Sequence, residues 1–226
     1  MRSSDILDEL RTLGDPWARQ GMARFGINPE HPLGIRIPRL RAVAKRVGRD
    51  HEVAADLWAS GIHEARILAV FVDDPACVTE AQMEAWAADF DSWDVCDQCC
   101  SALFARTTYG HRKAAAWSER EEEFVKRAGF ALMAALAVHD RHAPDAAFEV
   151  FLSLIEREAG DRRNFVRKAV NWALRQIGKR NPSLNAKAVE TAEHILEGGP
   201  RLARWVASDA LRELRGEPVR RKLGLL

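Results

Sequence analysis

Residues 165–182 read FVRKAVNWALRQIGKRNP, and the spacing of their apolar side chains sets the fold class. These side chains are three or four positions apart, so they line one face of a helix. They are Val166, Val170, Ala173, Leu174 and Ile177. The same periodicity runs along almost the whole chain, and no stretch shows the alternation of a β-strand. The sequence therefore predicts an all-α protein.

Three other segments repeat this pattern of a basic residue followed by an apolar helix. They are ARILAVFV from Ala65, KRAGFALMAAL from Lys126 and ARWVASDALREL from Ala203. The aligned basic residues are Arg66, Arg127, Lys168 and Arg204, with gaps of 61, 41 and 36 residues. The helix that begins at Trp93 fills the longest gap. Periods of about 30–45 residues with two helices each are typical of HEAT-like solenoids. We predict one HEAT-like repeat domain over residues 1–226, with inner helices lining a concave face.

Glycine and proline residues punctuate the predicted helices. Connections between the helices are short, and no low-complexity linker is present. The expected helices are 3–20, 38–48, 50–60, 62–72, 79–90, 93–107, 111–118, 121–140, 144–159, 163–180, 183–197 and 201–215.

Composition excludes two classes of protein. Of the 226 residues, 47% are hydrophobic and 30% are charged, which is typical of a soluble globular chain. The longest apolar run, from Ala128 to Val138, is shorter than the roughly 20 residues of a membrane-spanning helix. The charged N-terminus has no apolar core, so it is not a signal peptide. We expect a cytoplasmic protein with no membrane contact.

Charge is unevenly distributed. The net charge is +1, but residues 161–226 hold 15 Lys and Arg against 7 Asp and Glu. The first 160 residues hold 19 basic and 26 acidic residues. Such asymmetry favours a polyanion bound on the C-terminal part, although basic helices are often only solvated.

Four cysteines are too few and too clustered for a disulfide framework. We expect reduced thiols in the core. A zinc site would need Cys96, Cys99 and Cys100 together with a histidine such as His111, and C-x-x-C-C without a second C-x-x-C is a weak zinc signal. We predict no metal.

The helix that begins at Trp93 has two distinct faces. Trp93, Asp97, Ser101 and Phe104 share one face by helical spacing. The opposite, apolar face is formed by Val95, Cys96, Cys99, Ala102 and Leu103. A solvated carboxylate at a helix start would also explain Asp97, but Asp94 is closer to that start and suits the role better.

The helix at 163–180 carries a second stripe of Lys168, Trp172, Arg175 and Lys179. An aromatic ring among cations suits a nucleic-acid backbone. The alternative is a tryptophan packed on a neighbouring helix, with the cations extending past it to solvent. On the helix at 121–140, Arg127 stands at the edge of the apolar stripe, where it could instead pair with Glu123.

Over most of its length the chain resembles the HEAT-repeat DNA alkylation repair proteins, the AlkD-like alkylpurine DNA glycosylases. Four segments carry the resemblance. They are MARFGINPEHPLGIRIPRLR at 22–41, DSWDVCD at 91–97, FVKRAGFAL at 124–132 and FVRKAVNWALRQIGKRNP at 165–182. The motifs Trp-x-x-x-Asp and Lys-Ala-x-x-Trp-x-Leu-Arg are fairly specific together.

The resemblance implies roles for single residues. Trp93 and Trp172 would cradle the deoxyribose, and Asp97 would be the catalytic carboxylate. Phe25 would be among the DNA-binding residues, but members of the family carry tyrosine at this position, so a hydroxyl near the lesion is missing. Contacts with the DNA backbone are expected from Arg127, Lys168, Arg175 and Lys179.

The resemblance also implies an activity. The family excises N3- or N7-alkylated purines from duplex DNA without flipping the base and without a cofactor. We expect a monomer that lies on the nucleoid when bound to DNA. Which lesion is preferred stays open. The alternative is a non-catalytic HEAT-repeat scaffold that binds DNA or protein.

Overall fold

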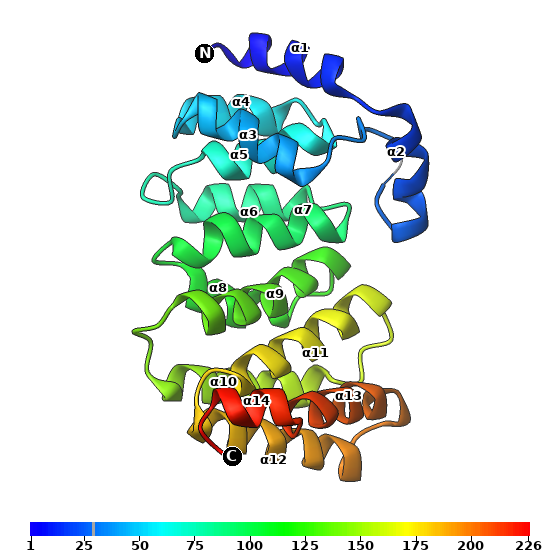
Figure 1. Cartoon of the computed structure of the whole chain (residues 1–226), viewed down its shortest axis with the longest axis vertical. Helices are drawn as coiled ribbons and strands as arrows, with labels where there is room; N and C mark the ends of the chain where they lie inside the picture. Colours follow the sequence, from blue (N-terminus) through cyan, green and yellow to red (C-terminus); the bar gives the residue numbers. More distant parts are fainter. Residues whose placement is uncertain (29) are drawn as a thin grey trace. The chain divides into compact units, whose positions relative to one another are not determined.

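A computed structural model describes residues 1–28 and 30–226, and within these ranges all regular secondary structure is helical. The predicted all-α class is confirmed. The chain divides into two compact units, residues 1–107 and 108–226, which are described separately below (Figure 1). The single domain over residues 1–226 stays a prediction. Among the described helices, none is both long and apolar enough to cross a membrane.

Unit 1 is built from short helices around an aromatic core. Trp58 and Trp86 stack in parallel with ring centroids 4.0 Å apart, and the Arg66 guanidinium lies 5.3 Å from the Trp58 ring centre. The elements are α1 (Ser3–Leu13), α2 (Pro16–Met22), the 3₁₀-helix η1 (Ala23–Phe25), α3 (Ile37–Val47), α4 (His51–Ala59), α5 (His63–Val72), α6 (Glu80–Ala88), α7 (Trp93–Gln98), the π-helix η2 (Cys99–Leu103) and the 3₁₀-helix η3 (Phe104–Arg106).

Unit 2 contains the longer helices. Helix α11 packs against both α9 and α13, and its predicted apolar stripe is fully buried. Helices α8 and α9 approach closely at Gly129, where a Cβ would lie 2.4 Å from the Ser118 backbone nitrogen. The elements are α8 (Gly110–Ser118), α9 (Glu123–His139), α10 (Asp145–Glu158), α11 (Asn164–Gly178), α12 (Pro182–Gly198), η4 (Arg201–Ala203), α13 (Arg204–Leu214) and α14 (Glu217–Lys222).

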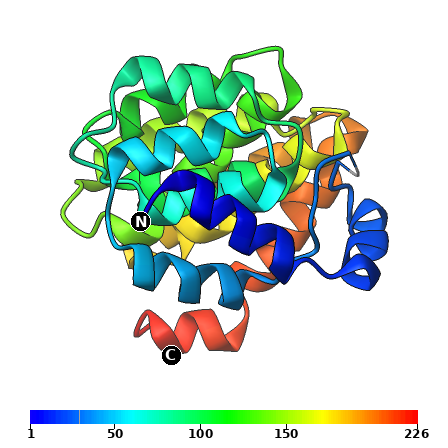
Figure 2. The same ribbon diagram turned by 90° about the horizontal axis from the view of Figure 1, so that it is seen from above.

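The helix expected over residues 3–20 is two helices. Pro16 begins α2, and the Asp15 side chain caps it by accepting hydrogen bonds from the backbone N–H groups of Trp17 and Ala18. Since Asp before Pro is a helix-start signal, the break could have been read from the sequence. None of the α2 residues is buried, and the helix lies to one side of α3, α4 and α5 in both views (Figures 1 and 2).

The helix expected over residues 93–107 is also wrong beyond Gln98. There the backbone widens into the π-helix η2 and then tightens into η3. A π turn holds more residues than an α turn, so the residues after it change face. Phe104 is therefore fully buried, and its predicted place on the same face as Asp97 is wrong.

Candidate nucleic-acid interface

Trp93 begins α7 and is tied to the N-terminal segment of unit 1. Its indole Nε1 donates a hydrogen bond of 2.7 Å to the backbone carbonyl of Phe25. Close by in the sequence, the Asn28 amide donates to the Asp91 carboxylate at 2.8 Å. The Phe25 side chain itself is 69% exposed. The backbone of Phe25 thus fixes the half-buried Trp93 indole, while its phenyl ring stays at the surface.

Asp97 lies one helical turn after Trp93 and is half-buried. Its backbone carbonyl accepts a hydrogen bond of 2.7 Å from the Ser101 hydroxyl, at the point where α7 gives way to η2. Residues four apart on a helix are surface neighbours. The predicted pairing of an aromatic ring and a carboxylate on one face is therefore compatible with the helix that the structure shows.

Asp94 fills the role of the helix-start carboxylate. It accepts hydrogen bonds from the Ser92 hydroxyl at 2.9 Å and the Val95 backbone at 3.0 Å, and its other oxygen lies 2.8 Å from His63 Nε2. Burial lowers the pKa of His63, but the hydrogen bond and charge of Asp94 outweigh burial, so the pKa is raised. Burial alone would raise the pKa of Asp94, but its hydrogen-bond partners and the charge of His63 lower the pKa below the ordinary value. The Asp94 carboxylate is therefore used in contacts that stabilise the fold.

In unit 2, Arg127 is only 6% exposed. Its Nη1 donates a hydrogen bond of 2.6 Å to the backbone carbonyl of Phe165, in the first turn of α11. The alignment of the internal repeats placed Arg127 on an inner helix, but it gave no information on how deeply the side chain is buried. The structure adds a role that the sequence did not suggest, because this side chain joins α9 to α11.

The cationic stripe of α11 is divided along its length. Lys168 is exposed and Trp172 is half-buried. Further along, Arg175 Nη1 and Lys179 Nζ both bind the carboxylate of Glu213 on α13, the lysine at 2.6 Å. Burial raises the pKa of Glu213, but the hydrogen bonds and charges of Lys179 and Arg175 lower it further, so it lies below the ordinary value. The cations of the second half of the stripe therefore bind a protein carboxylate and do not extend freely to solvent.

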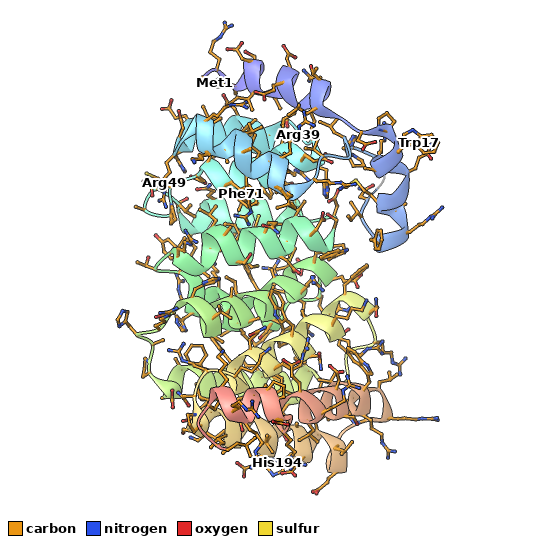
Figure 3. The ribbon with its side chains drawn as sticks, in the orientation of Figure 1. Met1, Trp17, Arg39, Arg49, Phe71 and His194 are labelled. Carbon is orange, nitrogen blue, oxygen red and sulfur yellow. The ribbon has the colours of Figure 1, made fainter. Side chains whose placement is uncertain are left out.

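Sequence reasoning missed a basic helix in unit 1. Helix α3 contains four cations and no acidic residue. Arg39 is exposed on it (Figure 3), Arg41 lies 4.3 Å from the Phe71 ring centre, and Arg46 pairs with Glu9. Beside α3 is a cavity of about 330 Å³. The signal was present in the run from Arg36 to Arg49, but counting charges over 160 residues concealed it.

The cysteines are only partly as expected. Cys96, Cys99 and Cys100 are buried, and burial raises the pKa of the Cys99 thiol well above its ordinary value, which keeps it protonated. Cys77 is exposed, so its expected place in the core is wrong. Among the described residues, no group of His, Cys, Asp and Glu side chains is arranged to hold a metal ion.

The predicted site residues fall in both units. Phe25, Trp93 and Asp97 lie in unit 1, where Trp93 and the Phe25 backbone are in contact. The other five lie in unit 2, where Arg175 and Lys179 meet at Glu213. These five are Arg127, Lys168, Trp172, Arg175 and Lys179.

A comparison with protein families identifies the chain. The model of the DNA alkylation repair enzyme family matches residues 6–214. The chain belongs to this family. It is 24% identical over 200 residues to the uncharacterized protein Lin0241 of Listeria innocua, covering 86% of this chain and 87% of that protein.

A comparison with solved structures identifies the fold. A solved member of a family related to the HEAT-like repeat DNA glycosylases, a family with affinity for branched DNA structures, has a TM-score of 0.81. Sequence identity is 18%, and the match covers 99% of this chain and 97% of that one. This member of the DNA alkylation repair enzyme family therefore has the HEAT-like repeat fold that the sequence predicted.

Proposed function

We propose that this protein excises positively charged N3- or N7-alkylated purines from duplex DNA, with the lesion left in the base stack. The observation that supports this most directly is the arrangement at the start of α7. There the Trp93 indole is held by the Phe25 carbonyl, and Asp97 follows one turn later. A second aromatic, Trp172, stands in unit 2 with the exposed Lys168 one turn before it.

These residue types suit the reaction. An alkylated purine already carries positive charge, so its N-glycosyl bond breaks with the electron pair leaving on the base and no general acid is needed. The remaining barrier is the oxocarbenium character that grows on the sugar. The Asp97 carboxylate stabilises this charge and orients the water, which bonds to the anomeric carbon and gives up its extra proton to bulk water. The faces of Trp93 and Trp172 favour the cationic sugar. The reaction needs no cofactor.

The proposal assigns phosphate contacts according to exposure. Lys168 is exposed, so it can approach a DNA backbone without rearrangement. Arg127, Arg175 and Lys179 already bind protein oxygens, so we expect each of them to contribute less than Lys168. We further propose that the protein acts as a cytoplasmic monomer that joins the nucleoid when bound to DNA.

A second candidate is DNA binding without excision. Phe25 favours it, because an exposed phenyl ring cannot supply the hydroxyl expected at that position. The solved relative with affinity for branched DNA also favours it. In this case the chain would keep the DNA-binding surfaces and lack the chemistry.

One experiment separates the two candidates. Base release is measured from a duplex with a single N7-methylguanine, and then from one with N3-methyladenine, using wild type, Asp97→Asn and Asp8→Asn. The Asp8→Asn variant makes the same substitution at an exposed site on α1. We expect release by wild type and Asp8→Asn, and none by Asp97→Asn, with the duplex Kd of all three within about twofold.

Two results would count against the glycosylase. Release by Asp97→Asn at the wild-type rate would remove Asp97 from the mechanism. No release of either base by wild type, with duplex binding intact, would favour the second candidate.

A further inference from the structure

Unit 2 contains a cleft of which the proposed function uses only Lys168. It lies where the start of α11 meets η4 and the start of α13, and its volume is about 470 Å³, within the usual range of ligand sites. Trp205 is 46% exposed in it and Leu202 43%. Large apolar side chains that are exposed next to one another are typical of a binding surface. The lining residues are Asn164, Arg167, Lys168, Arg201, Leu202 and Trp205.

A glycine makes the cleft possible. At Gly160, between α10 and α11, a Cβ would lie 2.6 Å from the Pro200 ring, closer than real Cβ contacts allow. Pro200 immediately precedes η4, which begins at Arg201. The absence of a side chain at Gly160 therefore lets the segment that leads into η4 approach the loop that leads into α11.

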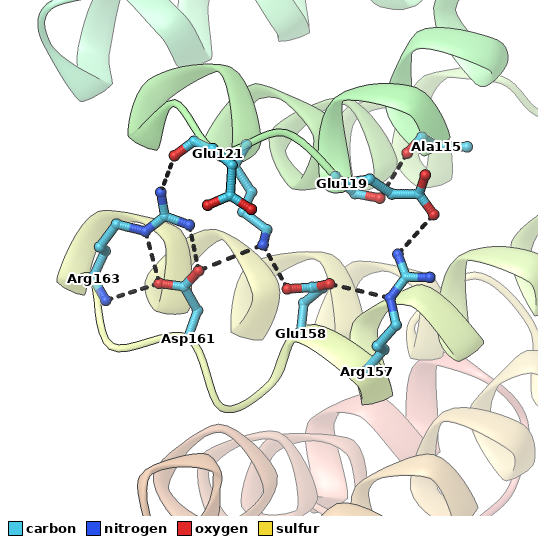
Figure 4. A network of polar contacts seen from close by, with 9 residues as sticks. Ala115, Glu119, Glu121, Arg157, Glu158, Asp161 and Arg163 are labelled. Carbon is cyan, nitrogen blue, oxygen red and sulfur yellow. Dashed lines mark hydrogen bonds and ion pairs between the residues drawn. The ribbon is translucent and has the colours of Figure 1, made fainter.

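An ion-pair network also holds this loop (Figure 4). The Asp161 carboxylate accepts hydrogen bonds from the Arg163 backbone and guanidinium, and the Lys126 ammonium lies 3.7 Å from it. Lys126 also pairs with Glu158 at 2.6 Å. The two carboxylates that precede α11 are thus engaged by other cations, and the start of α11 is fixed in place.

The cations of the cleft differ from several others in unit 2. Among the described residues, no carboxylate pairs with Arg167, Lys168 or Arg201, whereas Arg212, Arg215 and Arg221 each have an acidic partner. Arg167 Nε is buried without a hydrogen-bond partner, as is Arg175 Nε, but Arg175 has a carboxylate at its Nη1. An uncompensated cluster of three cations beside an apolar floor has the charge complementarity to bind a polyanion.

The geometry at Trp205 restricts the chemical class of the ligand further. The Arg167 guanidinium lies 5.6 Å from the centre of the Trp205 ring and so occupies one face of the indole. The ring is nearly half exposed, which leaves its remaining surface for a second flat group. Bases inside a duplex have both faces covered by their neighbours, so an unpaired base is the partner that fits this ring.

We infer that this cleft binds an unpaired nucleotide of DNA. Its base stacks on Trp205 beside Leu202, and the flanking phosphates contact Arg167, Lys168 and Arg201. The inference rests on the DNA-binding part of the proposed function and does not depend on base release.

The test compares two DNA probes, a blunt duplex and the same duplex extended by a short single-stranded tail. Fluorescence anisotropy gives Kd for wild type, Trp205→Ala, Trp205→Phe and Trp17→Ala. Trp17 is the matched control, since it is 84% exposed on α2 of unit 1 (Figure 3). We expect wild type to prefer the tailed duplex by about tenfold, from base–aromatic stacking. Trp205→Ala should lose that preference, Trp205→Phe should keep part of it, and Trp17→Ala should keep all of it.

Three results would overturn the inference. They are equal binding of both probes by wild type, an unchanged preference in Trp205→Ala, and a self-associating wild type that Trp205→Ala makes monomeric without changing either Kd. Base release from the blunt methylguanine duplex should be the same in Trp205→Ala and wild type. If wild type releases no base but shows a Trp205-dependent tail preference, the glycosylase proposal fails and this inference stands.

Discussion

Two cations lie near the start of α11, and two lie at its other end, where Arg175 is in the last turn and Lys179 directly follows the helix. The two pairs have different surroundings. Near the start of α11, Arg167 and Lys168 line an open cleft and have no acidic partner among the described residues. Two turns later, Arg175 and Lys179 bind Glu213 of α13. The sequence places Lys168, Arg175 and Lys179 in one stripe, yet only one end of the helix has charge to offer a ligand. Helical periodicity sets the direction of a side chain, and the neighbouring helix decides whether its charge is already compensated.

The largest expected effect comes from removing the cations at the start of α11. In the double variant Arg167→Ala/Lys168→Ala, affinity for tailed duplex should fall by about tenfold or more at moderate salt. The slope of log K against log salt should become shallower by about two, since each lost phosphate contact removes about 0.9. Anisotropy titrations over a salt series measure both quantities.

The matched control is Arg212→Ala/Arg215→Ala, which removes the same charge from cations that have acidic partners. An equal loss in this control would mean that net charge, rather than the cleft, accounts for binding.

A smaller effect is expected from removing the Glu213 carboxylate, which binds the cations at only one end of α11. Glu213→Gln leaves the partly buried Lys179 without its carboxylate and leaves Arg175 with only Asp209, 3.9 Å from its Nε. We expect a loss of about 2 kcal/mol in the free energy of unfolding, because a partly buried pair is broken rather than replaced. The freed cations should also raise duplex affinity a few fold. Urea unfolding and the same anisotropy titrations measure the two changes.

Glu190→Gln removes one negative charge at an exposed position of α12 and serves as the control. If both variants have wild-type stability, Glu213 does not hold the second half of the stripe.

The smallest effect is a pH dependence. The pKa of Glu213 in the folded state lies below its ordinary value of 4.5. A depressed pKa gives stability that is present above the unfolded-state value and is lost as pH falls through the folded-state value. The difference in unfolding free energy between wild type and Glu213→Gln should therefore be constant at neutral pH and shrink in the acid range below 4.5. If this difference in unfolding free energy stayed constant as the pH fell far below 4.5, the ion pairs of Glu213 would be contradicted.

Much of the fold followed from the spacing of apolar residues. The stripe from Val166 to Ile177 is fully buried as predicted. The π-helix after Gln98 was not predictable in this way, because Cys99, Ala102 and Leu103 fit an ordinary α-helical face equally well. Spacing reports periodicity, and a single extra residue in one turn leaves the apolar pattern almost unchanged.

The candidate site was less predictable than the fold. Trp93 and Asp97 could be placed on one helix from their spacing, but the partner of Trp93 is a backbone carbonyl, and the sequence contains no signal for that contact. Arg127 aligned with other repeat cations, although alignment cannot tell a buried guanidinium from an exposed one. Trp205 was overlooked because the repeats were aligned on Arg204, one position before it.

The contact between Gly160 and Pro200 has a consequence for related sequences. The Pro200 ring occupies the space that a side chain at position 160 would need. The two positions should therefore covary across the family. A relative with a side chain at the first position should carry a smaller residue at the second, or a longer connection before the helix that follows. Relatives that replace both Gly160 and Pro200 would preserve the cleft. In relatives that replace only Gly160, Trp205 would no longer lie beside α11.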